Sequence, residues 1–178
     1  MRKITEPCAN YGKSANRTGW QIALQCECFE RGGDMDNGTE FGNVEGADGI
    51  LTIRGGGGNV RGWNGIRYKA GLSAKNVGAT KLSMNVATIP PGGVAYAHIH
   101  VGFEVMLYIL EGRVRHEYGP ALEHTLENEA GDFIFIEPGV PHEVFNMSDT
   151  EPVVAVVARS DASEWENIVN FTRPGKAE

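Results

Sequence analysis

The stretch KLSMNVATIPPGGVAYAHIHVGFEVMLYILEGRVRHEYGP, residues 81–120, decides the fold of this chain. Runs of β-branched, aromatic and aliphatic residues alternate here with turn signals roughly every 8 to 12 residues, which is typical of a β-sandwich or a β-barrel. Prolines and glycines break the runs at 90–93 and at 119–120. Their fixed or positive φ angles suit turns and end strands.

The same pattern continues to residue 158 and predicts an all-β domain. We expect strands near 81–89, 95–100, 104–110, 112–118, 123–126, 132–136, 142–146 and 153–158. Antiparallel strands of this size favour a jelly roll, in which two facing sheets leave few exposed edges. A single helical turn is expected over 164–171, capped by Asp161 or Ser163.

The first 62 residues differ from the rest. They are rich in Gly, Asn and Asp and contain a row of glycines at 55–58. Two short runs, Gln21–Leu24 and Ile50–Ile53, are candidate strands. Glycine at this density raises the entropic cost of ordering a segment. We therefore expect an N-terminal extension over 1–62, which either wraps a partner subunit or is largely disordered, and a β-barrel domain over 63–178.

Charge and composition exclude several partners. The 178 residues carry a formal net charge of -7 with scattered Lys and Arg, which argues against nucleic acid or an anionic membrane surface. No apolar stretch approaches the roughly 18 residues of a membrane span. The N-terminus lacks the apolar run of a secretory signal, and the three cysteines are an odd number. A cytoplasmic protein with reduced thiols is expected.

Two histidines stand two positions apart in His98-Ile99-His100. Side chains at this spacing in a strand share a face, with Cα atoms about 7 Å apart. Two imidazoles so placed can converge on one metal ion. Glu104 follows after Gly102, where the chain can bend and return a carboxylate to the same face.

Two segments resemble the paired motifs of the cupin superfamily. The first contains Gly92, the His98–His100 pair, Glu104 and Gly112; the second is GDFIFIEPGVPHEVFN, residues 131–146. The resemblance covers about residues 81–158 and extends to small bacterial RmlC-like cupins. It implies a double-stranded β-helix with a metal held by His98, His100, Glu104 and His142.

This sequence departs from the cupin pattern at two places. The gap from Glu104 to Gly112 is one residue longer than the commonest spacing, and a β-bulge could absorb the difference. The usual proline of the second motif is Glu137 here, followed by Pro138. His116 and His124 have no such partners, and we do not expect a site role for them.

The implied ligand set suits one divalent ion of Mn, Fe, Co, Ni or Zn. An open coordination position would polarise a carbonyl, activate water or bind dioxygen. If Glu104 begins its strand, the period of two points Met106, Tyr108 and Leu110 into the pocket. The pocket would then be apolar, with the Tyr108 phenol as an acid or hydrogen-bond donor beside Glu104.

Two functions are compatible with such a site. The first is a metalloenzyme that acts on a small oxygenated organic molecule by oxygenase, isomerase or lyase chemistry. The alternative is a non-catalytic module that binds a metal or small ligand. Thiol dioxygenation is less expected, because those cupins usually have three histidines and no glutamate ligand. A sugar-phosphate isomerase would require cations in the pocket, for which the candidates are Arg67, Lys69, Arg113 and Arg115.

Apolar residues occupy both faces of the run 105–110, with Val105, Leu107 and Ile109 opposite Met106 and Leu110. Both faces of the sheet therefore need cover. A homodimer that packs sheet on sheet would supply it, as would the N-terminal extension.

Overall fold

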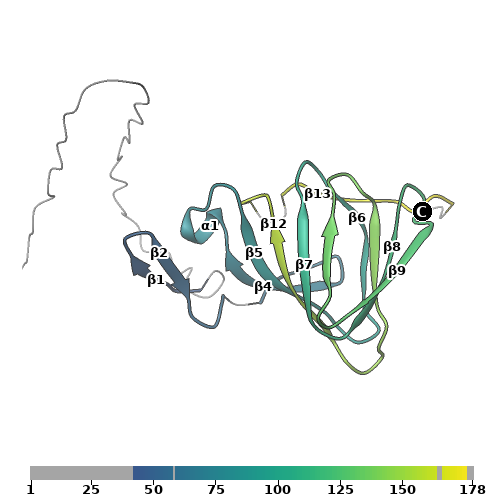
Figure 1. The fold of residues 1–178 in the computed structure, drawn as a ribbon, viewed down its shortest axis with the longest axis horizontal. Coiled ribbons are helices and arrows are strands. Elements are labelled where there is room, and N and C mark those ends of the chain that lie inside the picture. Colours follow the sequence, from purple (N-terminus) through teal and green to yellow (C-terminus); the bar gives the residue numbers. More distant parts are fainter. Residues whose placement is uncertain (1–41, 58, 164–165, 176–178) are drawn as a thin grey trace, which may run out of the picture. The chain divides into compact units, whose positions relative to one another are not determined.

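The structure is a computed structural model that describes residues 42–57, 59–163 and 166–175, with residues 59–63 described by their backbone alone. Among these residues it contains strands and one short helix (Figure 1). The elements are β1 (Val44–Ala47), β2 (Ile50–Ile53), β3 (Asn59–Trp63), β4 (Ile66–Leu72), α1 (Ala74–Val77), β5 (Ser83–Ile89), β6 (Val94–His100), β7 (Val105–Glu111), β8 (Arg113–Tyr118), β9 (His124–Glu129), β10 (Phe133–Ile136), β11 (His142–Asn146), β12 (Val153–Arg159) and β13 (Ile168–Asn170).

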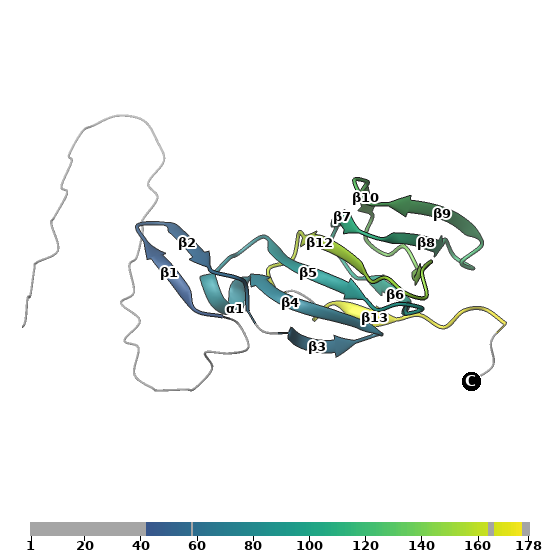
Figure 2. The ribbon, with the colours of Figure 1, turned by 90° about the horizontal axis from the view of Figure 1, so that it is seen from below.

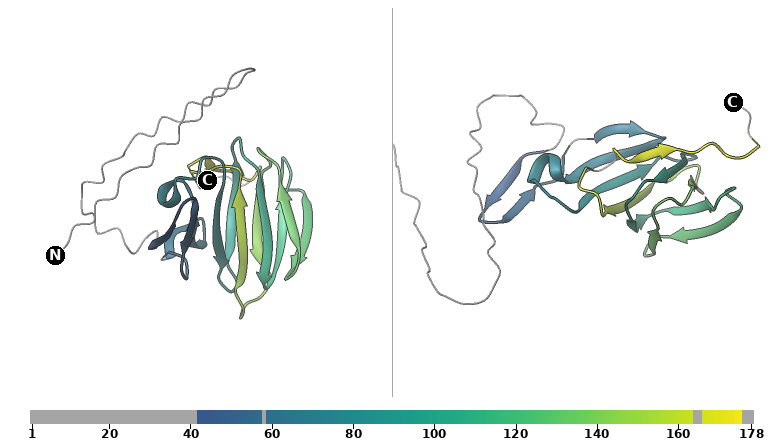
Figure 3. Two further views of the ribbon diagram at one scale, coloured as in Figure 1. Left: turned by 60° about the vertical axis from the view of Figure 1, so that its left-hand side comes forward. Right: turned by 90° about the horizontal axis from the view of Figure 1, so that it is seen from above.

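Two antiparallel sheets form the jelly roll. One has the strand order β10-β7-β12-β5-β4-β3 and the other β13-β6-β11-β8-β9, while β1 and β2 form a separate hairpin. Figures 2 and 3 show the strands of the two sheets from further directions. The all-β double-stranded β-helix expected from the sequence is therefore confirmed. The first strand of the larger sheet, β3, begins four residues before the expected domain boundary at residue 63.

The strands expected between residues 81 and 158 are all present, with ends shifted by up to three residues. The candidate strand Ile50–Ile53 is β2, whereas Gln21–Leu24 lies outside the described residues. The β3–β4 hairpin was not expected. Its turn is Asn64-Gly65, and both residues have positive φ angles, 56° and 76°, as hairpin turns with an Asn-Gly pair require.

The helical turn expected over 164–171 is wrong. Ile168–Asn170 forms β13, which pairs with β6 at His98, Ile99 and His100. Asp161 does cap the preceding turn, because its carboxylate accepts from the Ser163 N–H at 2.8 Å and from the Asn167 amide at 2.8 Å. The edge of β6 offers ladder hydrogen bonds to Ile168–Asn170, whereas a helix of eight residues is only marginally stable.

The core lies between the inward faces of the two sheets. Inward residues alternate with outward ones along each strand, so that Val153, Ala155, Val157 and Arg159 of β12 are all buried. Burying one Val or Ile side chain stabilises the fold by about 1.5–3 kcal/mol. The same alternation determines which side chains face the interior of the barrel.

Candidate metal centre

Three buried histidines meet inside the barrel. His98 and His100 come from β6, and His142 opens the neighbouring strand β11, where it pairs with His98. One ring nitrogen from each of the three lies within 4.8 Å of the others. The side chains are 5%, 5% and 3% exposed. Strand period and cross-strand pairing thus bring together three of the four ligands that the cupin resemblance implies.

Backbone carbonyls orient two of these rings. The Nδ1 atom of His98 lies 2.7 Å from the carbonyl oxygen of Tyr96, and the Nδ1 atom of His142 lies 2.9 Å from that of Val140. Because a carbonyl only accepts, each Nδ1 carries the hydrogen and each Nε2 keeps its lone pair. A hydrogen bond of this kind is the usual support of a metal-binding histidine. The donor set therefore fits a metal ion.

The environment keeps the three imidazoles neutral. Burial is the largest cause that lowers the pKa of His98 to about 3 and that of His100 to about 2, with repulsion from His142 second. Burial also lowers the pKa of His142. At neutral pH all three rings are uncharged, which is the form that binds a metal ion. His98, His100 and His142 can therefore bind a metal without first losing protons.

Glu104 does not join this cluster. Its side chain is exposed, and its backbone is held by Ser160, whose Oγ accepts from the Glu104 N–H at 2.9 Å. The Ser160 N–H donates in turn to the Glu104 carbonyl at 3.0 Å. Val105, the next residue, lines the cavity beside the histidines instead.

The register of β7 explains this difference. Strand β7 pairs with β12 residue by residue from Val105 to Ile109, and a register shift follows that leaves Leu110 between the paired residues Ile109 and Glu111. Neighbouring residues of a strand point to opposite faces, and the commonest cupin spacing falls on Val105. Val105 therefore takes the inward position, and Glu104 points to the other face of the sheet.

Because Val105 points inward, Tyr108, three residues later, points away from the interior. Val105, Leu107 and Ile109 line the cavity, whereas Met106 and Leu110 are 55% and 45% exposed. The Tyr108 ring packs on Phe133, with 4.6 Å between ring centroids, and Phe133 is 81% exposed. The face expected to line the pocket is therefore the outer face of the sheet.

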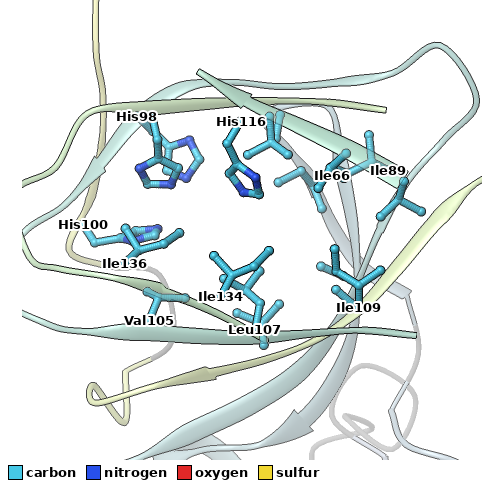
Figure 4. A pocket seen from close by; sticks show the side chains of 18 of the residues that line it. Ile66, Ile89, His98, His100, Val105, Leu107, Ile109, His116, Ile134 and Ile136 are labelled. Atoms are coloured by element: carbon cyan, nitrogen blue, oxygen red, sulfur yellow. The ribbon is translucent and has the colours of Figure 1, made fainter. Parts of the chain in front are cut away.

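A cavity of about 70 Å³ extends from the histidines into the barrel. Figure 4 shows His98, His100 and His116 extending into the same space as Ile66 and Ile109. His116 is 6% exposed, and burial followed by repulsion from His142 lowers its pKa to about 4. No site role was expected for His116. However, His116 lies two residues after the buried Val114 on β8, so strand alternation predicts that it points inward as well.

Arg159 is the cationic side chain that lines this cavity among the described residues. The four candidate cations for a sugar-phosphate site do not line it, and Arg113 and Arg115 instead pair with Glu127 and Glu117. Arg159 ends the alternating run of β12 and is 3% exposed. Alternate residues of a strand share a face, so the buried Val153 predicts that Arg159, six residues later, also points inward.

A second cavity of about 370 Å³ adjoins the first. The two share His116, Ile134, Ile136 and His142 in their linings. The second is also lined by Leu126 of β9 and Phe135 of β10, the edge strands of the two sheets (Figure 2). The gap between these edges therefore gives access to the histidines.

Comparisons with solved structures return cupin enzymes. An oxalate decarboxylase from Lactobacillus farciminis, in a formate complex, has a TM-score of 0.54 and 20% identity, over 62% of this chain and 32% of its own. An oxalate oxidase bound to the substrate analogue glycolate has a TM-score of 0.51 and 23% identity, over 64% of this chain and 58% of its own. This chain thus spans about a third of the decarboxylase and somewhat over half of the oxidase.

A third structure is a Bacillus subtilis oxalate decarboxylase, described for its Mn(II) centres, with a TM-score of 0.52 and 20% identity, over 64% of this chain and 29% of its own. No curated protein matches this sequence. The structural likenesses show the fold, since the identities are low. Residues 85–159 match the model of the cupin domain. Together with the two facing antiparallel sheets, this match places residues 85–159 of the chain in the cupin domain family.

Proposed function

We propose that this protein is a metalloenzyme that binds one divalent transition metal through His98, His100 and His142 and acts on a small oxygenated organic molecule. The observation that carries the proposal is the convergence of three buried, neutral imidazoles at a cavity. Nitrogen ligands suit Mn, Fe, Co, Ni and Zn. Bound there, the ion would supply open coordination positions and Lewis acidity.

Two reaction classes are favoured by different observations. The similar structures are named as oxalate decarboxylase and oxalate oxidase, which supports lyase or oxidase chemistry on a small acid. A cluster of three histidines without Glu104 supports an oxygenase instead, because thiol-oxygenating cupins usually have that ligand set. In either class, the chain's own residues exclude water with aliphatic side chains and hold the substrate beside the histidines.

The test is a turnover assay on untagged protein loaded separately with each of the five metals. Keto acids, diketones, aldoses and thiols are supplied, and oxygen consumption and carbon dioxide release are measured. We expect turnover with one metal, and its loss in His142→Ala but not in His124→Ala, because His124 is exposed on β9. Tight ligand binding without any product would contradict the enzyme and favour the binding module.

We further propose that the protein is a homodimer and that a second copy covers the outer face of the larger sheet. Phe133 and Phe135 of β10 lie opposite Tyr108 and Met106 of β7 in the ladder, and Phe133, Phe135 and Met106 are more than half exposed. Exposed apolar clusters of this kind mark contact surfaces.

A second copy of the same chain provides a matching apolar surface. Arg67 and Lys69 point outward from β4, which lies three strands from β7 in the sheet, so the apolar residues of β7 and β10 stand apart from these two cations. A twofold axis through this patch would place the apolar residues of the two copies against each other.

A further inference from the structure

We infer that the cavity selects a small monocarboxylate with a branched aliphatic body, and that Arg159 binds the carboxylate. This inference rests on the proposed function, because the same carboxylate would lie beside the metal. It goes further by naming the substrate class and a specificity-determining residue. The carrying observations are the position of Arg159 among the cavity-lining side chains and the aliphatic character of most of the others.

Arg159 stands next to the histidine cluster. It pairs with Val105 in the β12–β7 ladder, and both side chains line the cavity. After burial and the neighbouring histidines, the charge of Arg159 is a further cause of the low pKa of His98 and His100. The guanidinium lies over the Tyr68 ring, 5.7 Å from its centroid. It is therefore a fixed cation at the same end of the cavity as the candidate ligands.

A guanidinium is the side chain best suited to bind a carboxylate. It stays charged at all physiological pH values and presents parallel N–H groups that match two carboxylate oxygens. The side chain is 3% exposed, so its field is little screened by water. A carboxylate beside Arg159 and a divalent ion would thus be strongly favoured over a neutral group.

The remainder of the cavity accepts only an apolar body. Besides the histidines, Tyr68 and Arg159, its walls are aliphatic, and they are formed by Ile66, Ala87, Ile89, Ala95, Val105, Leu107, Ile109, Val114, Ile134, Ile136, Val144, Val153, Ala155 and Val157. A second carboxylate among these side chains would be desolvated without a partner, at a large cost in free energy. The cavity therefore disfavours a dianion such as oxalate, the compound named for the similar enzymes.

The size of the cavity limits the ligand. The cavity has a volume of about 70 Å³, and one water molecule needs about 10–15 Å³ of such space. Since a water has one non-hydrogen atom, the cavity holds a ligand of roughly five to seven non-hydrogen atoms. Isobutyrate has this size and a branched body. Isobutyramide and oxalate have the same number of non-hydrogen atoms, but the first lacks the charge and the second lacks the apolar body. Comparing the affinities of the three compounds therefore tests the effect of the charge and that of the apolar body separately, in ligands of the same size.

The experiment is calorimetric titration of metal-loaded protein with the three compounds, after the metal content of each sample has been measured. We expect isobutyrate to bind at least about tenfold more tightly than isobutyramide, because a charged hydrogen bond is lost with the amide. Isobutyrate should also bind more tightly than oxalate. In Arg159→Gln, isobutyrate affinity should fall to that of the amide, whereas Arg113→Gln, a change at an exposed arginine, should leave it unchanged.

Ala87→Leu provides a second test if Arg159→Gln fails to fold. Ala87 lines the cavity away from the histidine strands, so the larger side chain should exclude isobutyrate while acetate still binds. Equal affinity for isobutyrate and isobutyramide, or tighter binding of oxalate, would overturn the inference in a protein with normal metal content. A protein that takes up no metal would instead overturn the proposed function.

Discussion

At the scale of single residues, the position of one carboxylate determines the charge of the site. Glu104 is exposed and held by Ser160, and the three histidines are neutral. A divalent ion bound by three imidazoles keeps its full double charge, whereas a glutamate ligand would reduce it by one. With the proposed ion bound, this site should therefore hold anionic ligands more tightly than a site with a glutamate ligand would.

Glu104→Gln tests that assignment. Because the side chain lies outside the cluster, we expect the variant to keep the metal content and the turnover of the wild type to within about twofold. Metal analysis and steady-state kinetics on the same samples provide the readout. If metal content falls as it does in His142→Ala, Glu104 is a ligand, and the loop between His100 and Val105 rearranges when the metal binds.

The buried histidines predict a loss of stability in mild acid for the metal-free protein. Burial lowers the pKa of His116 to about 4 and that of His98 to about 3, against about 6.5 in the unfolded chain. Below pH 6.5 the unfolded state binds protons that the folded state does not. The free energy of unfolding should therefore fall between pH 6.5 and 5, by up to about 1.4 kcal/mol per pH unit for each such histidine.

Urea unfolding at several pH values measures this slope. His116→Gln should make the slope shallower, whereas His124→Gln, at an exposed position, should leave it unchanged. A free energy of unfolding that stays constant from pH 7 to 5 would show that the histidines are protonated in the folded state. Added metal should raise stability by a similar amount from pH 7 to 5, because the pKa values of His98 and His100 in the folded protein, about 3 and about 2, lie below this range.

At the scale of elements, the β3–β4 turn supports the strand that carries two of the candidate ligands. The Asn64 amide donates to the carbonyl of Tyr96, the same oxygen that accepts from Nδ1 of His98. Gly65, the next residue, has a φ of 76°, and a Cβ added there would lie 2.1 Å from the carbonyl oxygen of Val94. The turn therefore approaches β6 too closely for any side chain at this position.

Gly65→Ala is expected to lower both stability and metal affinity. The clash must push the turn away from β6, at a cost above the roughly 1 kcal/mol of an alanine at positive φ alone. Gly78→Ala is the matched control, because Gly78 has a similar φ of 67° and nothing within 4 Å of the added Cβ. Thermal unfolding and metal titration of both variants should show the larger loss at Gly65. Equal losses would mean that the contact with Val94 has no effect.

The strands between residues 81 and 158 could be predicted because most of the apolar runs end within two residues of a proline or glycine. Strand β3 could not, since Gly62 and the preceding glycines hide its pattern, and only the Asn64-Gly65 pair marks the hairpin. Strand β13 forms because the edge of β6 is available, which a local sequence does not show. Tertiary pairing of this kind overrides local propensity.

The convergence of His98, His100 and His142 was predictable from the period of two and from the cupin resemblance, whereas the placement of Glu104 depended on a single residue of register. Arg159 and His116 were missed for another reason. Counting by two along β8 and β12 gives their inward direction, but Arg159 lies one residue beyond the strand expected over 153–158. Arginine is mostly exposed in proteins and histidine is often exposed, so strand alternation alone gave no reason to choose these two residues as part of the site.

At the scale of the whole molecule, the outer face of the larger sheet predicts self-association. Met106→Glu places a charge among Phe133, Phe135 and Tyr108, and we expect it to convert a dimer into a monomer by light scattering. Tyr96→Glu, at a residue that is 59% exposed on the other sheet, is the control and should remain dimeric. A wild-type protein that is monomeric at high concentration would contradict the dimer and leave the N-terminal residues to cover this face.

No helix among the described residues is long and apolar enough to cross a membrane. The cavity, the histidines and the access between β9 and β10 all belong to the barrel, whose larger sheet begins at β3. We therefore propose that the residues before β3, 1–58, are largely dispensable for metal binding. The domain organisation expected from the sequence, an N-terminal extension followed by a barrel domain, therefore stays a proposal.

The most direct test of the metal centre is elemental analysis of untagged protein and four single variants. We predict about one transition metal ion per chain in the wild type and in His124→Ala, and strongly reduced metal in His98→Ala, His100→Ala and His142→Ala. The melting temperature should fall together with the metal content, because an ion bound only by the folded state stabilises it. Unchanged metal content in the three variants, or a wild type that binds no metal from any of the five salts, would contradict the account.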